Sequence, residues 1–333
     1  MRAAVLDHDG LSVRGWPDPA PGPGEVLVAL TRVGICGSDV HFALERSVRT
    51  AFLPIVLGHE PAGIVAAVGF GVAEHWVGRR VAVVPMLSCG DCAFCNSGRT
   101  RLCRGREVLG ADRHGCWAEL VVVPEANLLP IPDGVPDEVA AVATDAVATA
   151  FHAVRTRGEV GPGLRVAIWG AGGLGLCAVA IARSLGADSV VAIDPRAAAR
   201  ERALAHGADM AYEPDTAWRG PVDVALEFVG RAASVEAAIR SLDRGGRAVV
   251  VGIGPERISG GGLTGFAMSE REVLGSVGAE PDEVREVLDL LADGRLVLPN
   301  LVGEHVALED VGAGLGLVAD GRSGSGRVIV DVS

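Results

Sequence analysis

The chain contains no lysine and no glutamine, and its only tyrosine is Tyr212. The absence of lysine excludes enzymes that form a Schiff base on a lysine side chain, and P-loop nucleotidases, whose phosphate-binding loop requires one. It also excludes reductases in which a lysine assists a tyrosine as the proton donor. Aromatic residues make up only 4% of the chain although 49% of it is hydrophobic, so its cores must be built from valine, alanine, leucine and isoleucine.

Positive charge is also scarce, and the formal net charge is −12. Nucleic acids and anionic membranes bind proteins through basic faces, so neither is an expected partner. The nearest approach to an uncharged membrane span is Val166–Ala182, which is rich in glycine and fits a buried strand and helix better. We expect a soluble cytoplasmic protein that acts on a small molecule. A length of 333 residues allows two domains.

Four cysteines form the run C-x2-C-x2-C-x7-C, at Cys89, Cys92, Cys95 and Cys103. Four thiolates this close together can close a tetrahedral zinc site, which then has no position left for chemistry. Disulfides are disfavoured because nothing at the N-terminus looks like a secretory signal. A bacterial iron–sulfur motif would have three residues and then Cys-Pro, whereas this run ends Cys103-Arg104. The run therefore predicts a structural zinc ion.

The chain changes character near Thr144. The part before it predicts short strands and turns, for example at Val26–Thr31, Gly63–Val68, Arg80–Val84 and Ala118–Val123. The part after it predicts strands that alternate with helices: helices at Thr144–Val154, Leu174–Leu185 and Arg196–His206, and strands at Arg165–Gly170, Ser189–Asp194, Val222–Phe228 and Arg247–Ile253. This alternation indicates a doubly wound parallel sheet. We expect the tail (helices Asp282–Asp293 and Leu308–Val318, strand Arg327–Val332) to pack back onto the first domain.

A glycine-rich turn joins the first of these strands to its helix. Gly170, Gly172, Gly173, Leu174 and Gly175 lie in a G-x-G-x-x-G pattern, whose glycines permit a tight turn, a close approach of the backbone to a pyrophosphate, and close packing of helix on strand. The pyrophosphate would lie at the N-terminus of the helix, where N–H groups and the helix dipole favour an anion. The pattern predicts a dinucleotide site.

Asp194 ends the next predicted strand, 24 residues after Gly170. The carboxylate that binds the ribose 2′-hydroxyl of NAD is expected roughly 20 residues after the first glycine. Since a carboxylate repels a 2′-phosphate, NAD is favoured over NADP. Arg196 and Arg200 follow closely and keep NADP open, although both also fit a solvated helix face. Asp194 also fits a simpler role at a helix N-terminus, because Pro195 follows it.

Three further segments carry metal-binding side chains: Gly34–His41 with Cys36, Gly58–Glu60 with His59, and Thr144–Thr149 with Asp145. Taken singly, each has an ordinary structural explanation. Together, Cys36, His59 and one carboxylate would give zinc three ligands and leave a fourth position for water or substrate. Asp145 is the preferred carboxylate because the others nearby, Asp133, Asp137 and Glu138, sit among prolines on an expected surface loop.

With these pieces in place, the chain resembles the zinc-dependent medium-chain alcohol dehydrogenases from end to end. The resemblance implies a GroES-like β-rich catalytic domain at residues 1–146 and 283–333, and a Rossmann domain at residues 147–282. It implies a catalytic zinc ion on Cys36, His59 and Asp145, with Glu60 beside it, and a structural zinc ion on the four-cysteine run. It also implies a dimer or tetramer of identical chains.

The same resemblance gives the remaining residues their roles. Ser38 would bond the substrate oxygen and pass its proton toward His41 through the cofactor ribose. Thr149 and the backbone of Val251 and Gly252 would contact the nicotinamide, and Gly170–Gly175, Asp194 and Arg196 would hold the rest of the dinucleotide. The implied reaction is hydride transfer between an alcohol, favoured to be secondary and fairly apolar, and NAD. A polyol dehydrogenase and a non-catalytic protein that binds zinc and nucleotide are the alternatives.

Overall fold

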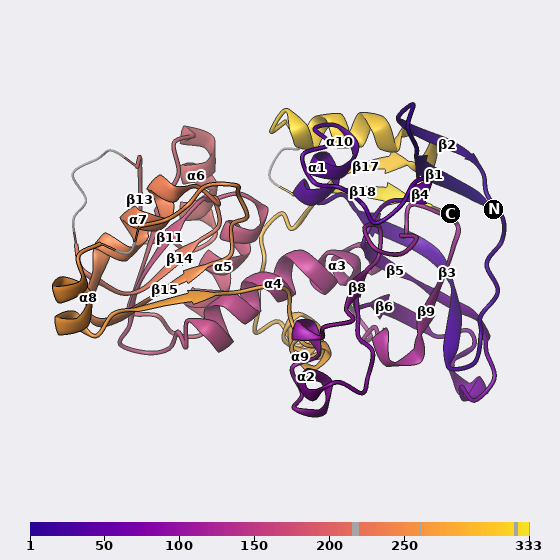
Figure 1. Ribbon diagram of the computed structural model, residues 1–333, viewed down its shortest axis with the longest axis horizontal. Coiled ribbons are helices and arrows are strands. Elements are labelled where there is room, and N and C mark those ends of the chain that lie inside the picture. Colours follow the sequence, from indigo (N-terminus) through magenta and orange to yellow (C-terminus); the bar gives the residue numbers. More distant parts are fainter. Residues whose placement is uncertain (215–219, 260, 323–325, 333) are drawn as a thin grey trace. The chain divides into compact units, whose positions relative to one another are not determined.

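The computed structural model describes residues 1–214, 220–259, 261–322 and 326–332. The chain forms two compact units. The first unit consists of Met1–Asp145, Glu280–Ala292 and Asn300–Ser333, and the second of Ala146–Ala279 and Asp293–Pro299. Both termini belong to the first unit (Figure 1).

The first unit is built around a seven-stranded sheet with the order β10-β6-β5-β3-β18-β17, in which β9 also pairs with β3. Its strands are β3 (Glu25–Gly34), β5 (Glu60–Val68), β6 (Arg80–Val83), β9 (Leu120–Pro124), β10 (Leu128–Pro130), β17 (Val302–Ala307) and β18 (Arg327–Asp331). A second sheet has the order β2-β1-β4, with β1 (Arg2–Leu6), β2 (Leu11–Gly15) and β4 (Ile55–Val56). β18 lies antiparallel to β3, so the C-terminal tail completes the sheet begun by the N-terminal segment (Figure 1).

Short helices and one small hairpin complete the first unit. The hairpin pairs β7 (Met86–Leu87) with β8 (Glu107–Val108). The α-helices are α1 (Gly37–Ala43), α2 (Ala93–Asn96), α3 (Asp137–Val142), α9 (Pro281–Ala292) and α10 (Val311–Ala319). The 3-10 helices are η1 (Glu74–Trp76), η2 (Thr100–Leu102), η3 (Glu125–Asn127) and η6 (Leu308–Asp310). The π-helical turn η4 (Ala143–Val147) begins in the first unit and its last two residues belong to the second.

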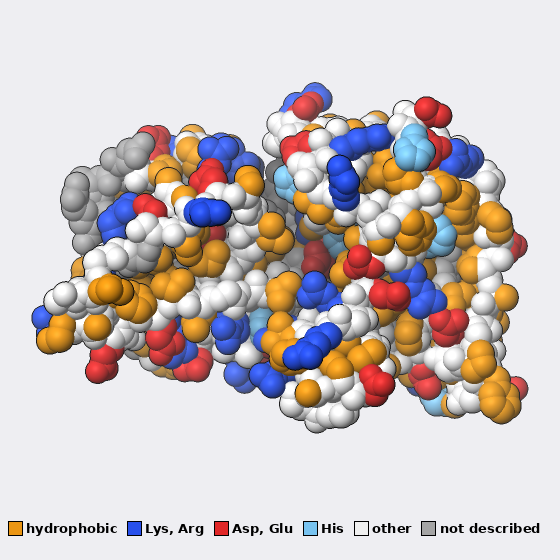
Figure 2. All heavy atoms as spheres, in the orientation of Figure 1, with side chains coloured by type: hydrophobic (Ala, Val, Ile, Leu, Met, Phe, Trp, Pro, Cys, Tyr) orange, Lys and Arg blue, Asp and Glu red, His pale blue; other side chains and the backbone are white. Residues whose placement is uncertain are grey.

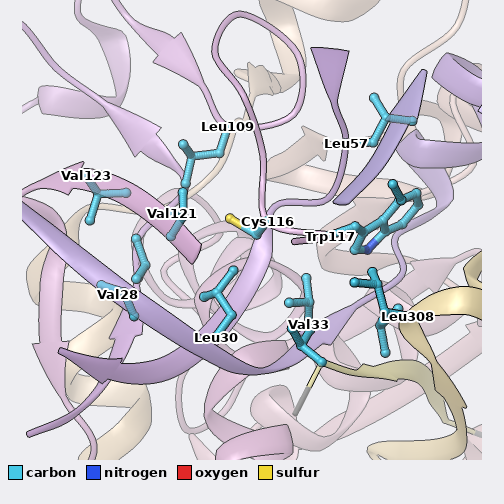
Figure 3. Packing of buried hydrophobic residues seen from close by; sticks show 14 of the residues in the cluster. Val28, Leu30, Val33, Leu57, Leu109, Cys116, Trp117, Val121, Val123 and Leu308 are labelled. Carbon is cyan, nitrogen blue, oxygen red and sulfur yellow. The ribbon is translucent and has the colours of Figure 1, made fainter. Parts of the chain in front are cut away.

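The core of the first unit follows from the alternation of its strands. Along β3, Val26, Val28 and Leu30 point to the same face and are buried, as the period of two in a half-covered strand requires. They pack in one cluster with Leu109, Cys116 and Trp117 (Figure 3). Trp117 is completely buried. Replacing such a side chain by alanine typically costs about 3 to 5 kcal/mol of stability.

The second unit is a six-stranded parallel sheet with the order β13-β12-β11-β14-β15-β16. Its strands are β11 (Arg165–Trp169), β12 (Ser189–Ile193), β13 (Met210–Tyr212), β14 (Val222–Glu227), β15 (Leu242–Val250) and β16 (Glu272–Gly275). Its helices are α4 (Ala148–Phe151), α5 (Gly173–Ser184), α6 (Ala197–Ala205), α7 (Ala232–Ser241), α8 (Leu263–Ser269) and the π-helical η5 (His152–Arg157). In chain order the strands are arranged 3-2-1-4-5-6, the order of dinucleotide-binding folds, so the predicted doubly wound sheet is confirmed.

The central strand of this sheet shows why the chain folds this way. From Val166 to Trp169 every residue of β11 is buried, which is the pattern of a parallel strand covered on both faces. The chain continues from β11 to β12 on one side of it and later returns to form β14 on its other side. This reversal of the strand order creates a switch point at the carboxyl edge of the sheet. Ligands of open α/β sheets bind at such a point.

On the surface, acidic and basic side chains are interspersed on the face drawn in Figure 2. Large hydrophobic side chains are exposed on α8, where Leu263 and Met268 are 87% and 77% exposed, and after β15, where Ile253 is 86% exposed. None of the helices in the described ranges combines the length and the apolar character that a membrane crossing would require.

Candidate active site

Cys36 lies directly before α1 and is buried. Its backbone N–H donates to Oδ2 of Asp39 at 2.9 Å, so the first turn of the helix fixes the position of this cysteine. Asp39 is itself completely buried. A carboxylate three residues into a helix satisfies an N–H group that the helix leaves without an intrahelical partner.

His59 and Glu60 lie where the chain enters β5, directly after Gly58. Gly58 has a φ of +89°, and a Cβ there would lie 2.5 Å from the ring of Trp117. The neighbouring glycines are equally constrained, since a Cβ on Gly115 would lie 2.3 Å from the carbonyl oxygen of Gly58, and one on Gly110 would lie 2.9 Å from its nitrogen. The loop that carries His59 therefore packs backbone against backbone, which fixes the direction of the imidazole.

Asp145 reaches the same place from the π-helical turn η4. The sequence predicted one regular helix over Thr144–Val154, whereas the structure has a π-helical turn, the short helix α4 and a second π-helical turn, η5. Each π-type turn inserts a residue into the helical repeat and rotates the side chains that follow, and such turns are frequent at functional sites.

Ligand atoms of Cys36, His59, Glu60 and Asp145 all lie within 4.8 Å of one another. Sγ of Cys36 is 3.6 Å and Nε2 of His59 is 3.7 Å from Oδ2 of Asp145. Zinc bonds of about 2.0 to 2.3 Å at tetrahedral angles place neighbouring ligand atoms about 3.4 to 3.7 Å apart. The thiol, imidazole and carboxylate therefore fit a zinc ion held by three protein ligands with one position open.

His59 is oriented by a residue that the sequence reasoning did not select. Its Nδ1 lies 3.3 Å from Oδ1 of Asp39, which leaves Nε2 directed at Asp145. Burial alone would lower the pKa of His59, but the charges of Asp39 and Asp145 raise it well above its ordinary value. A carboxylate on the far nitrogen is the usual partner of a zinc-bound histidine. In the sequence, the only signal for this role of Asp39 was its position three residues after Cys36.

Glu60 is completely buried, and its Oε1 accepts a hydrogen bond from Nη2 of Arg327 at 2.6 Å. Burial raises the pKa of Glu60 to about 8, and Arg327 opposes that rise. For Asp145, burial would raise the pKa as well, but His59 holds it below its usual range. Asp145 is thus the ionised carboxylate of the cluster, and Glu60 is tied to β18.

Ser38 and His41 both lie on α1. Oγ of Ser38 is 3.4 Å from Nε2 of His59, so the hydroxyl borders the cluster. His41 lies nearer the surface, with its side chain 49% exposed and its Nδ1 2.7 Å from Glu45 and 3.2 Å from Ser47. The structure brings Ser38 to the candidate metal site and places His41 one helical turn farther out.

Of the competing carboxylates, Asp137 is engaged elsewhere. Asp137 is the first residue of α3 and pairs with Arg80 at 2.6 Å, while its other oxygen accepts from the hydroxyl of Thr31. Glu138 follows it on the same helix. The expectation of a surface loop was wrong at these two residues, because Pro136 precedes the helix as its N-cap and does not interrupt it.

Cys89, Cys92, Cys95 and Cys103 gather in a separate lobe around α2 and η2. Their sulfur–sulfur distances include 3.3, 3.6, 3.8 and 3.9 Å. Four sulfurs about 2.3 Å from one zinc ion lie about 3.8 Å apart, whereas a disulfide bond is about 2.0 Å long. The cysteines are unpaired and fit a closed tetrahedral site.

In the second unit, the glycine turn has the geometry its pattern predicts. Gly170 follows β11 with a φ of +90°, and a Cβ on Gly175 would lie 1.8 Å from the carbonyl oxygen of Gly170. A Cβ on Gly172 would meet nothing within 4 Å, so the backbone is open there. Gly173 and Leu174 form the first turn of α5, which begins after Gly172.

Asp194 follows β12 and is buried, with only 2% of its surface exposed. Its Oδ2 accepts the N–H of Ala171 at 2.9 Å, inside the glycine turn. Both of its oxygens also accept from the guanidinium of Arg196 at 3.0 Å. Burial would raise the pKa of Asp194, but Arg196 holds it below its usual value, so the carboxylate is ionised. The helix N-cap is Arg196 and not Asp194.

The residues expected at the nicotinamide lie in two places. Thr149 is buried in α4. Val251 and Gly252 follow β15, and both of their N–H groups donate to the carbonyl oxygen of Glu227, at 2.8 and 3.0 Å. Their carbonyl oxygens are therefore the groups that this backbone can offer to a cofactor. Gly252 has no room for a side chain, because its Cβ would lie 2.1 Å from the nitrogen of Gly230.

Comparison with known proteins identifies the family. Residues 22–133 match the family model of the alcohol dehydrogenase GroES-like domain, and residues 173–293 match that of the zinc-binding dehydrogenases. The chain is 31% identical over 341 residues to L-threonine 3-dehydrogenase of Mesorhizobium japonicum, across 97% of this chain and 95% of that protein. The chain belongs to the zinc-dependent medium-chain alcohol dehydrogenase family.

Solved structures of other proteins agree with this assignment to the medium-chain dehydrogenases. Alcohol dehydrogenase from Thermus sp. ATN1 superposes with a TM-score of 0.93 at 30% identity, over the full length of both chains. Acetophenone reductase from Geotrichum candidum, solved with NAD, gives a TM-score of 0.89 at 30% identity, over 99% of this chain and 97% of that one. The GroES-like and Rossmann folds are thereby confirmed, and the protein is an oxidoreductase of this family.

Proposed function

We propose that the protein is an NAD-dependent dehydrogenase that interconverts secondary alcohols and ketones, with its catalytic zinc ion on Cys36, His59 and Asp145. The proposal rests on one observation above all. A thiol, an imidazole nitrogen and an ionised carboxylate converge within 4.8 Å, and the hydroxyl of Ser38 lies 3.4 Å from that imidazole nitrogen. No structural role in the described part of the chain requires that combination.

A zinc ion bound there supplies Lewis acidity, which lowers the pKa of an alcohol that shares the site. Ser38 accepts the hydrogen bond of the substrate hydroxyl and, as it takes that proton, gives up its own proton toward His41 through the cofactor ribose. His41 exchanges that proton with solvent, and its exposed position on α1 suits this role. The carbon that bore the hydroxyl gives a hydride to the nicotinamide, so the alcohol becomes a ketone as NAD becomes NADH.

Glu60 has a supporting role in this proposal. Oε1 is held by Arg327, and Oε2 is buried without a hydrogen-bond partner among the described residues. Such an oxygen beside a metal site can exchange with a metal ligand or balance the charge of the ion. The four cysteines of the lobe hold a second zinc ion, which has a structural role because four thiolates leave it no open position.

For the cofactor, we favour NAD because Asp194 is ionised and lies beside the glycine turn, where a carboxylate can accept from the ribose 2′-hydroxyl and repels a 2′-phosphate. Arg196 pairs with that carboxylate and is 55% exposed, so it offers a positive charge to a 2′-phosphate, and NADP is the less favoured cofactor. A zinc-binding dehydrogenase of Sinorhizobium meliloti that is 30% identical was solved with NADP.

The curated relatives favour a second candidate substrate. L-threonine 3-dehydrogenases of Mesorhizobium japonicum and Sinorhizobium medicae are each 31% identical to the chain, and the second match covers 99% of this chain and 98% of that protein. The hydroxyl of L-threonine is a secondary alcohol, so the same residues would act on it. We also propose a homo-oligomer, since Ile253, Leu263 and Met268 expose apolar surface. Light scattering would measure its size.

The test combines metal analysis with turnover. The purified protein is expected to hold two zinc ions, and Asp145→Ala is expected to hold one and to lose nicotinamide reduction with a panel of secondary alcohols. Cys177→Ala is the control, since this buried cysteine lies on α5 and outside both clusters. A wild-type protein with a single zinc ion, held by the four cysteines, would contradict the proposal.

A further inference from the structure

A pocket of about 610 Å³ opens in the first unit, between the turn that joins β1 to β2 and the loop that follows α1. Apolar and basic side chains make up its wall, together with one threonine: Leu6, His8, Phe42, Arg46, Val48, Arg49, Thr50, Phe52 and Leu53. No acidic side chain is among them. Because the chain as a whole carries a net charge of −12, a pocket with two guanidinium groups and an imidazole is a departure from its surroundings.

Arg46 is held in place without an acidic partner. Its guanidinium donates to the carbonyl oxygens of His8 and Asp7 at 3.2 and 3.1 Å. Its backbone has a φ of +50°, a left-handed conformation that is uncommon outside glycine, asparagine and aspartate. Neutral carbonyl groups orient a guanidinium but leave its positive charge uncompensated, so Arg46 is a fixed cation at the wall of the pocket.

Arg49 is a second cation without a counter-charge. It makes no hydrogen bond or ion pair with any residue that the structure describes. The nearest acidic residues in sequence are engaged elsewhere, since Glu45 lies 2.7 Å from Nδ1 of His41 and Asp7 pairs with Arg14 at 2.7 Å. Neither guanidinium in the pocket wall is therefore paired with a carboxylate of the described residues, and an anionic ligand would meet no competing acid there.

The apolar side of the pocket is anchored by the neighbouring loops. The ring of Phe52 meets His114 edge-on, with centroids 5.2 Å apart, and Nδ1 of His114 accepts the N–H of Val56 at 3.2 Å. The hydroxyl of Thr50 donates to the carbonyl oxygen of Phe52 at 3.0 Å, and the N–H of Ala51 donates to Ala111 at 2.8 Å. The wall is therefore formed before any ligand binds.

Phe42 belongs both to the pocket wall and to α1, the helix that carries Ser38. It lies four residues after Ser38 on α1, and residues at that spacing are neighbours on one face of a helix, about 6 Å apart at Cβ. Ser38 in turn lies 3.4 Å from Nε2 of His59. A substrate whose hydroxyl meets Ser38 can extend along Phe42, which stands in the same pocket wall as the two arginines.

We propose that this pocket binds the carboxylate of the substrate, so that the protein oxidises hydroxy-carboxylates in which a short hydrocarbon chain separates the carboxylate from a secondary alcohol. Phe42 and Phe52 cover the chain, and Arg46 and Arg49 bind the carboxylate. The inference rests on the proposed function. In the reaction, the carbinol carbon loses a hydride to NAD and the hydroxyl loses its proton through Ser38, while the carboxylate is unchanged.

The lining also separates two kinds of anionic substrate. An amino acid such as L-threonine carries an ammonium group beside its carboxylate, and that group would need an acceptor or an acid in the pocket wall. The wall offers two guanidinium groups, an imidazole, one threonine hydroxyl and apolar groups, but no carboxylate. A hydroxy acid without an ammonium group is the better match, and this distinguishes the proposal from the activity in the names of the relatives.

The decisive experiment compares 5-hydroxyhexanoate with its amide, which has nearly the same shape and no charge. With zinc-loaded protein, kcat/KM is expected to favour the carboxylate by about tenfold, as one charge-assisted hydrogen bond provides. Arg49→Gln is expected to abolish that preference, through a fall in kcat/KM with the carboxylate that is much larger than any fall with the amide, whereas Arg49→Lys should restore part of it. Arg240→Gln, on the surface of α7, is the matched control.

Calorimetry supplies a readout independent of turnover, with hexanoate and hexanamide as probes and the wild type compared with Arg49→Gln. Hexanoate is expected to bind the wild type about tenfold more tightly than the variant, and hexanamide equally to both. Equal oxidation of both hydroxy compounds, with no change in Arg49→Gln, would overturn the carboxylate pocket and leave the proposed function intact. If neither compound nor any alcohol is oxidised, the proposed function fails, and the hexanoate titration still decides for or against the pocket.

Discussion

Oδ1 of Asp39 lies 3.3 Å from Nδ1 of His59, while Oδ2 of the same carboxylate accepts the N–H of Cys36. One buried carboxylate thus positions two of the three proposed zinc ligands. It does so from α1, the helix that also carries Ser38.

Replacing Asp39 by asparagine is expected to weaken zinc binding at the catalytic site by about 10- to 100-fold, because the far nitrogen of His59 loses its carboxylate. Competition with a chelator, followed by mass spectrometry of the bound zinc, measures the change. Asp289→Asn, an exposed position on α9, is the control. An unchanged affinity in Asp39→Asn would remove its assigned role.

The cysteine lobe is expected to lose its zinc ion in Cys95→Ser, because three thiolates and a hydroxyl bind zinc much more weakly than four thiolates. Zinc content should fall by one ion per chain, and the melting temperature should fall with it, since binding of the metal contributes to folding. Full zinc content in this variant would show that Cys95 is not a ligand.

Glu280 joins this lobe to α9. It accepts from the guanidinium of Arg101 at 2.6 Å, and both side chains are largely buried. Glu280→Gln is expected to lower the free energy of unfolding by about 1 to 3 kcal/mol, because a shielded guanidinium loses its charged partner. Asp282 belongs to a surface ion pair, and its side chain is 90% exposed. Asp282→Asn should therefore change the free energy of unfolding by less than about 0.5 kcal/mol. Urea titration of both variants checks the contrast.

Arg196 is expected to influence which dinucleotide is used. In Arg196→Ala, kcat/KM with NADP should fall by about tenfold, because the exposed cation nearest a 2′-phosphate is lost and the carboxylate of Asp194 is no longer compensated. The value with NAD should change little. A loss of NAD activity larger than that of NADP activity would contradict this assignment.

The stability of the second unit is expected to fall in acid partly through Asp223. Hydrogen bonds from Arg165 lower the pKa of this carboxyl below its ordinary value of 3.8. A folded-state pKa below the unfolded value stabilises the fold above the unfolded pKa, and this contribution is lost as the pH falls through the folded value. Asp223→Asn lacks this contribution. Its free energy of unfolding should therefore fall less than that of the wild type as the pH falls from the ordinary pKa of the carboxyl toward the folded-state pKa, and urea titration measures the difference.

The sequence predicts most of the second unit, because its signals are local. The glycine turn, the buried run of β11 and the carboxylate of Asp194 each occupy the place expected for them. Asp194 nevertheless accepts hydrogen bonds from the N–H of Ala171 and the guanidinium of Arg196, and only the folded structure reveals these contacts. The candidate ligands Cys36, His59 and Asp145 were chosen through a resemblance, since residues so far apart in the chain carry no spacing rule.

Other features have no signal in the sequence. The π-helical turn at Asp145 depends on packing against the rest of the protein. In the sequence, Asp39 cannot be told from an ordinary capping residue of a helix, because its contact with His59 exists only in the folded structure. The basic pocket was missed for a similar reason. Arg46 and Arg49 lie in a segment without a recognisable motif, and only the fold shows that both stand in one pocket wall.

The contacts among Gly58, Gly110 and Gly115 bear on attempts to change which alcohols the enzyme accepts. Any library that randomises these positions will consist almost entirely of inactive clones, because even alanine would displace the strand that presents His59. The segment from Arg46 to Phe52 includes exposed side chains and forms much of the wall of the proposed carboxylate pocket. Directed evolution should therefore concentrate its diversity there and leave the three glycines untouched.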